Sequence, residues 1–241
     1  MSDQPDVSGA AWSTPEMVAG FAQSAPNAVL LRFAAAERRR RGGNARALDL
    51  GCGAARNAIP LIGLGWDVVG TDLSWPMLSA AAQRARQERV GHHLHLIRAP
   101  MDQIPARSQS FDLVIAHGIW NLARSATEFR EALREAARVA RRGASLFVFT
   151  FSRNTFPAET TPVPGEPFVF TQFSGHPQCF LTESQLMEEL GAAGFTHDPA
   201  VPLTEYNRLQ PTTLPGRTPP AIYEAAFRLG PLHGDTSRVA P

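Results

Sequence analysis

Two carboxylates and a pair of glycines lie close together in the first third of the chain. Asp49, Gly51 and Gly53 belong to the run Asp-Leu-Gly-Cys-Gly, and Asp72 follows 21 positions after Gly51. Glycine adopts positive φ readily and lets a ligand approach the backbone, because it carries no Cβ. A carboxylate beside such a turn repels a diphosphate but suits a ligand that presents an ammonium or another cation. The pattern predicts a binding site for a small molecule.

The elements that would position these residues alternate along the chain. We expect strands at the apolar runs 45–50, 66–70, 94–97, 111–116 and 144–151 and helices at 54–64, 76–90 and 127–141. Continuous apolar strands that alternate with amphipathic helices are typical of a doubly wound α/β domain, with a parallel sheet covered on both faces. The turn after the first strand of such a sheet lies at the carboxyl edge, where ligands bind.

The rest of the chain surrounds this core, and we predict one domain over 1–241. Its predicted parts are an N-terminal helical cap (12–41), a cofactor-binding core (45–151), an insertion rich in aromatic residues and proline (152–180), a closing helix and strands (181–230) and a tail (231–241). Within the closing part, Thr182 can cap a helix that ends at Gly191 or Gly194, and strands are expected at 195–201 and 221–229.

Composition limits the partners. The chain has 23 Lys+Arg against 22 Asp+Glu, so no broad charge attracts nucleic acid or an anionic membrane. Two cysteines and the lack of a leader or a long apolar run favour a cytoplasmic protein with a small-molecule substrate, whose oligomeric state stays open. We interpret the arginines at 38–41 as a solvated helix end, and the histidines at 92, 93 and 95 as surface residues, so that no metal site is expected.

The run from Asp49 to Gly53 resembles motif I of the class I S-adenosylmethionine-dependent methyltransferases. The Arg-Asn-Ala that begins at Arg56 is similar to the tellurite-resistance methyltransferases and other small-molecule members. The resemblance runs from about residue 45 to 200. It implies a Rossmann-like sheet of seven strands, mostly parallel with the last one antiparallel. The third glycine of the motif is Ala55 here, which is tolerable if that residue is already helical.

The resemblance also implies that S-adenosylmethionine is the cofactor. The glycine loop would hold its aminocarboxypropyl end, the carboxylate of Asp72 its ribose hydroxyls, and the backbone near Ala116 would face its ammonium. The residues expected at the cofactor are Asp49, Gly51, Cys52, Gly53, Arg56, Asp72, Leu73, Met101, Asp102 and Ala116. The adenine is held either by Asp102 or by the Met101 backbone amide and apolar packing, which we favour, and Asp102 could instead cap a helix.

Methyl transfer requires the acceptor, the methyl carbon and the sulfur to be collinear and shielded from water, whereas a base is optional. His117, at the end of the fourth strand, is the candidate base, although it could equally be a satisfied polar residue. Substrate contacts are expected from Trp12, Phe21, Trp120, Asn121, Phe156, Phe173 and His176.

The sequence therefore predicts a methyltransferase that acts on an O, N or S atom of a small, partly apolar metabolite. Two alternatives remain. One is a noncatalytic protein that binds S-adenosylmethionine on the same fold as an interaction or regulatory module. The other is an NAD-dependent oxidoreductase, which Asp49 and Arg56 disfavour because a dinucleotide fingerprint has no carboxylate before its first glycine and a glycine at position 56.

Overall fold

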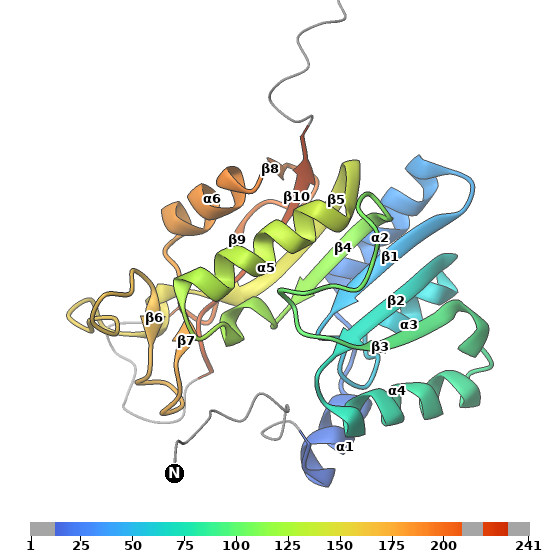
Figure 1. Ribbon diagram of the computed structural model, residues 1–241, viewed down its shortest axis with the longest axis horizontal. Coiled ribbons are helices and arrows are strands. Elements are labelled where there is room, and N and C mark those ends of the chain that lie inside the picture. The colour runs from blue at the N-terminus through green and yellow to red at the C-terminus, as the bar shows by residue number, and fades with distance from the viewer. Residues whose placement is uncertain (1–12, 209–218, 231–241) are drawn as a thin grey trace, which may run out of the picture.

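The five apolar runs expected as strands lie side by side in one sheet (Figure 1). The computed structural model describes residues 13–208 and 219–230. Its parallel strands are β1 (Ala45–Leu50), β2 (Trp66–Asp72), β3 (Leu94–Arg98), β4 (Phe111–His117) and β5 (Ala140–Phe151). Their spatial order is β3-β2-β1-β4-β5. The order reverses direction between β1 and β4, which creates a ligand-binding crevice at the carboxyl ends of these strands.

Three later strands complete the sheet. β10 (Ile222–Leu229) pairs antiparallel with β5, and β8 (Phe195–Asp198) pairs antiparallel with β10. This confirms the mostly parallel Rossmann-like sheet whose last strand along the chain is antiparallel. The short strand β9 (Thr204–Tyr206) pairs with β10 and raises the sheet to eight strands, one more than predicted.

Helices cover both faces of the sheet. The residues of α2 (Ala28–Arg41), α3 (Ala58–Gly63) and α4 (Trp75–Gln87) pack in one apolar cluster on one face. Those of α5 (Ala126–Val139) and α6 (Glu183–Ala192) pack in a second cluster on the other face. Thr182 caps α6 with a reciprocal capping box, as predicted. Helix α1 (Pro15–Gln23) packs on α4 and has no buried residue.

The insertion has more structure than a loop. It contains η4 (Arg153–Thr155), and β6 (Val169–Phe170) pairs antiparallel with β7 (Gln178–Cys179) in a separate two-stranded sheet. Figure 1 shows this small sheet beside the carboxyl end of β5. Two further single turns are η2 (Gly91–His93) and η3 (Trp120–Leu122), the latter just after β4.

Several element boundaries differ from the predicted ones. α3 begins at Ala58 and not at 54, because Ala55 has φ +61 and a left-handed residue cannot lie inside a right-handed helix. The same torsion shows that Ala55 is not helical, so alanine is strained at this position. β5 begins at Ala140, which pairs with Phe111 before a register shift. β8 ends at Asp198, whose side chain accepts a hydrogen bond from the Ala200 amide in the following turn.

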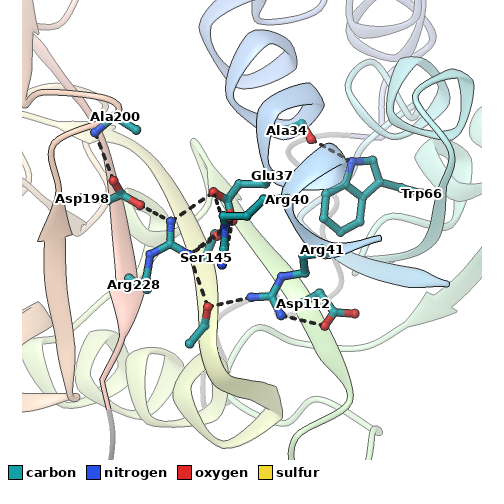
Figure 2. A network of polar contacts seen from close by, with 11 residues as sticks. Ala34, Glu37, Arg40, Arg41, Trp66, Asp112, Ser145, Asp198, Ala200 and Arg228 are labelled. Carbon is teal, nitrogen blue, oxygen red and sulfur yellow. Dashed lines mark hydrogen bonds and ion pairs between the residues drawn. The ribbon is translucent and has the colours of Figure 1, made fainter. Parts of the chain in front are cut away.

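An ionic network lies at the amino-terminal edge of the sheet (Figure 2). The buried carboxylate of Glu37 on α2 accepts hydrogen bonds from Arg40, Ser145 and Arg228. Arg228 also pairs with Asp198. Burial alone would raise the pKa of Glu37, but the hydrogen bonds from Arg40, Arg228 and Ser145 lower it to about 2. The network joins α2 to β5, β8 and β10.

The interpretation of 38–41 as a solvated helix end is therefore wrong for part of that run. Arg41 pairs with Asp112 at 3.0 Å and donates to the Gly143 carbonyl at 2.6 Å, with its side chain mostly buried. Arg38 donates to the Gly65 carbonyl at 2.8 Å. The carboxyl end of α2 lies beside neighbouring strands and loops, so its arginines bind their carbonyl and carboxylate oxygens. The sequence of α2 alone does not show that these oxygens are close.

Candidate functional site

The glycine turn after β1, residues 51–53, is packed against the segment after β4 and against helices α4 and α1. Gly51 has φ +63, and a Cβ built on it would lie 2.7 Å from Ile119 Cδ1 in the segment after β4. Gly53 has φ +52, and the atoms nearest to a Cβ built on it are Met77 Sδ and Phe21 Cδ1, both at 3.9 Å. Gly51 is therefore required for the close approach of the two loops, whereas Gly53 is buried beneath Met77 and Phe21 and needs glycine for its positive φ.

Asp72 lies at the carboxyl end of β2 with its carboxylate aimed at this turn. Its Oδ2 accepts a hydrogen bond from the Gly53 amide at 2.9 Å, and its Oδ1 accepts from the Ser74 amide at 2.8 Å. Burial raises the pKa of Asp72, although these backbone donors act in the opposite direction. Ser74 and not Asp72 is the N-cap of α4, since its side chain accepts from the Met77 amide. Each Asp72 oxygen keeps a second lone pair that could accept a ribose hydroxyl.

Asp49 lies beneath the turn and is 2% exposed. Burial raises the pKa of Asp49 to about 7; Arg56 opposes the rise and Asp72 adds to it. A bound cation would offset the cost of keeping this carboxylate charged. Two carboxylates beside a glycine turn fit the ammonium and ribose of S-adenosylmethionine, so the residues present suit that cofactor.

Cys52 and the residues expected near adenine complete this side of the site. Cys52 packs against β2, where a Cβ on Gly70 would lie 2.7 Å from its sulfur, and burial raises the pKa of its thiol. Met101 is buried after β3, and Asp102 lies in a turn. No helix begins after Asp102 before η3, which rules out a capping role. Its contact with adenine stays a prediction, as do those of Leu73 and Ala116.

His117 ends β4 and belongs to a polar chain that crosses the sheet edge. Its Nδ1 lies 3.1 Å from Arg56 Nη2, and its Nε2 lies 3.2 Å from Asn27 Nδ2. The ring stacks on Phe149 with 4.2 Å between centroids. Burial and the neighbouring Arg56 lower the pKa of His117 to about 4. A neutral imidazole with both nitrogens contacted is poorly prepared to act as a base near pH 7, and that role stays a prediction.

The segments expected to bind substrate differ in how accessible they are. Trp120 and Asn121 in η3 are buried, and no hydrogen-bond partner is present among the described residues for Trp120 Nε1 or Asn121 Oδ1. Phe21 lies over the Gly53 turn, and Trp12 lies outside the described residues.

The insertion gathers its aromatic rings into one cluster. Phe156 stacks on Phe170 with 5.1 Å between centroids, and Phe173 contacts Phe151 and Phe180 with ring edges. Phe173 is 40% exposed and His176 is exposed, so the two could meet a ligand, whereas most of the cluster forms the core of the insertion.

Sequence reasoning missed two residues of this site. Asn27 caps α2 with its side-chain oxygen. Glu224 on β10 is 3% exposed, and its Oε2 accepts a hydrogen bond from the side-chain nitrogen Nδ2 of Asn27 at 2.7 Å. A glutamate inside a mostly apolar strand was the available signal for Glu224, because a charged residue is seldom fully buried without a partner. Asn27 reads in the sequence as an ordinary cap.

Comparison with known proteins shows which family the central part of the chain resembles. Residues 48–148 match the protein family described as a methyltransferase domain. This segment runs from within β1 to within β5 and includes the glycine turn and both carboxylates. The match confirms the resemblance to class I S-adenosylmethionine-dependent methyltransferases and indicates S-adenosylmethionine as the cofactor.

Individual relatives are similar over parts of their length. Over 87 residues the chain is 38% identical to the ubiquinone/menaquinone biosynthesis C-methyltransferase UbiE of Rhizobium meliloti (strain 1021), covering 36% of this chain and 32% of that protein. The chain spans less than half the length of the curated relatives it matches.

Solved structures show the same fold. A Burkholderia thailandensis 1,6-didemethyltoxoflavin-N1-methyltransferase, with 1,6-didemethyltoxoflavin and S-adenosylhomocysteine bound, has a TM-score of 0.61 at 20% identity, and the match covers 85% of this chain and 79% of that one. The [4+2]-cyclase SpnF has a TM-score of 0.56 at 22% identity, with 74% and 59% covered. Within the described residues, no helix combines the length and apolar character needed to cross a membrane.

Proposed function

We propose that this chain is a methyltransferase that transfers the methyl group of S-adenosylmethionine to an O, N or S atom of a small, partly apolar metabolite. The observation that carries the proposal is the pair of carboxylates, Asp49 and Asp72, at the carboxyl ends of β1 and β2 beside the glycine turn. Asp49 lies on β1, beside which the strand order reverses, and Asp72 lies on the neighbouring strand β2; the carboxyl edge at such a reversal is the usual ligand site of an open α/β sheet.

The chain's own residues would bind and orient rather than react. S-adenosylmethionine supplies a methyl group on a positively charged sulfur when bound. Asp49 would pair with the ligand ammonium, and Asp72 would accept from the ribose hydroxyls while the Gly53 and Ser74 amides hold its carboxylate in place. Phe21 would exclude water from the turn. Positioning and desolvation of this kind are the main requirements of an in-line displacement.

The aromatic insertion supports a partly apolar acceptor. Phe173 exposes part of its ring at the edge of a cluster that includes Phe151 and Phe180. Rigid aromatic surface favours small apolar ligands. The curated relative UbiE is named a C-methyltransferase, so a carbon acceptor is the competing choice.

Asp72→Ala tests the cofactor assignment. We expect the variant to bind S-adenosylhomocysteine more weakly by roughly 1.5–3 kcal/mol, because it loses charged hydrogen bonds to the ribose. Isothermal titration calorimetry measures this change. Asp67→Ala is the matched control, because Asp67 lies at the opposite end of β2 and contacts Arg46 and His95 near the surface. Equal affinity of wild type and Asp72→Ala would contradict the assignment.

A noncatalytic or differently acting protein on the same fold is the second candidate. It is favoured by the likeness to a structure named as a [4+2]-cyclase, which shows that the fold is not confined to proteins named as methyltransferases. The two candidates differ in their product. Incubation with S-adenosylmethionine and fractionated metabolite pools should yield S-adenosylhomocysteine if the chain is a methyltransferase, whereas binding without any such product would favour the second candidate.

A further inference from the structure

One buried carboxylate near the candidate site has no positively charged partner. Five carboxylates are buried among the described residues: Glu37, Asp49, Asp112, Asp198 and Glu224. Glu37, Asp112 and Asp198 each form an ion pair with at least one arginine. No ion pair is present for Asp49 or Glu224 in the described part of the chain. The ammonium of the cofactor is the proposed partner of Asp49, which leaves Glu224 alone in this respect.

Neutral groups hold the Glu224 carboxylate. The Tyr206 hydroxyl donates to its Oε1 at 2.9 Å, and Asn27 Nδ2 donates to its Oε2 at 2.7 Å. Arg32 on α2 is exposed, and its charge acts on the Tyr206 hydroxyl, but no ion pair joins it to Glu224. A carboxylate can accept about four hydrogen bonds, so about two positions stay free. The amino-terminal end of α2 offers a partial positive charge beside Asn27, which offsets part of the cost of burying the carboxylate.

Glu224 lies where the acceptor is expected. Phe149 on β5 pairs with His117 on β4 and with Glu224 on β10, so the three side chains share one face of the sheet near its carboxyl edge. Neighbouring strands are about 4.8 Å apart, which puts the backbones of His117 and Glu224 about 10 Å apart. Asp49 and Asp72 place the proposed cofactor site on β1 and β2, on the other side of β4. The surface over β4, β5 and β10 is therefore left for the acceptor.

Tyr206 covers this carboxylate. Its side chain is 40% exposed, whereas Glu224 is 3% exposed. It lies on β9, a strand of three residues that pairs with β10, and its hydroxyl contacts Glu224 and Thr204. Rotation of this one side chain at the edge of the sheet would open the carboxylate to a ligand. The ring would then offer an aromatic face beside the bound group, which favours a cation.

We propose that Glu224 binds a positively charged group of the methyl acceptor, a protonated amine or a guanidinium, and so selects the acceptor. The inference rests on the proposed function. Such a cation supplies the charge that the buried carboxylate lacks, and its N–H groups occupy the free positions on the carboxylate oxygens. A protonated amine has no lone pair, so the bound cation anchors the acceptor, and another atom of the same molecule receives the methyl group.

Two pairs of probes that differ in charge but little in shape test this assignment. They are phenethylamine with 2-phenylethanol, and n-butylamine with n-butanol; both amines are protonated at pH 7. In calorimetry with the S-adenosylhomocysteine complex of wild type, the amine of at least one pair should bind roughly 10-fold or more tightly than its alcohol. Glu224→Gln should remove that preference. A purely structural role would weaken amine and alcohol alike and leave their ratio unchanged.

Tyr206→Phe provides a test in the opposite direction. It keeps the ring but removes the hydroxyl that occupies Glu224 Oε1, so the preference for the amine should grow. The variant also keeps the proposal testable if Glu224→Gln fails to fold. Glu131→Gln on α5 is the matched control, because Glu131 is half exposed and lies 3.9 Å from Arg134. It should keep the wild-type ratio.

Three results would overturn the proposal. One is a wild type that prefers neither amine to its alcohol, which includes the absence of measurable amine binding. The second is an amine preference that persists in Glu224→Gln, and the third is a smaller preference in Tyr206→Phe. Failure of wild type to bind S-adenosylhomocysteine would instead contradict the proposed function, and the same ratios measured on the unliganded protein would then decide the role of Glu224 separately.

Discussion

The substitution Glu37→Gln should lower the stability of this protein in a manner that depends on pH. The side chain of Glu37 is 7% exposed and holds three partners at once, from α2, β5 and β10. Its pKa falls from 4.5 to about 2 on folding, which corresponds to roughly 3 kcal/mol of stability at neutral pH. A folded-state pKa below the unfolded one means that this contribution is complete above about pH 5 and is lost as the pH falls towards 2.

Urea unfolding at pH 7 and at pH 3 measures this contribution. We expect Glu37→Gln to reduce the free energy of unfolding by about 3 kcal/mol at pH 7 and by clearly less at pH 3, where the wild-type advantage is partly titrated away. Glu131→Gln is the matched control on α5, because Glu131 is half exposed and lies 3.9 Å from Arg134; it should cost at most about 0.5 kcal/mol. A loss of the same size at both pH values would show that Glu37 acts through packing and not through its charge.

Two further predictions concern the turn after β1. Gly51→Ala should destabilise the fold by about 2–4 kcal/mol, since it adds a left-handed alanine and a Cβ 2.7 Å from Ile119 Cδ1; thermal unfolding measures this, and Ile119→Ala should relieve part of the clash if the reasoning holds. Binding of S-adenosylhomocysteine at pH 7 should release about half a proton from Asp49, whose pKa of about 7 falls beside an ammonium. The binding enthalpy should therefore vary with the ionisation enthalpy of the buffer in wild type and not in Asp49→Asn; a constant enthalpy in wild type would contradict this.

The sequence predicted the sheet because most residues of its parallel strands are apolar, which is typical of strands buried on both faces. It also predicted the glycine turn and the acidic strand ends, since those features are local. Ala55 shows where local reasoning fails. Alanine favours helices, but at this position the turn imposes φ +61, and only the structure of the surrounding loop reveals that requirement.

Long-range contacts account for the other differences. Glu224 lies 107 positions after His117, and only the pairing of β10 with β5 brings the two to one edge of the sheet. Arg41 likewise finds Asp112 through the path of α2 across the sheet. The roles proposed for the cofactor and substrate residues, including those of the insertion, stay predictions, because only their positions in the fold are known.

The helix α2 and the strand β10 are joined twice, by Asn27 with Glu224 at the site and by Glu37 with Arg228 at the opposite edge (Figure 2). Ten residues of helix rise about 15 Å, and four residues of strand rise about 13 Å, so the two attachment points have nearly the same spacing on both elements. The helix can therefore neither slide nor tilt along the strand without breaking a buried contact. A substitution in the distant ionic network should therefore shift the surroundings of His117. It should weaken ligand binding even though every residue of the site is unchanged.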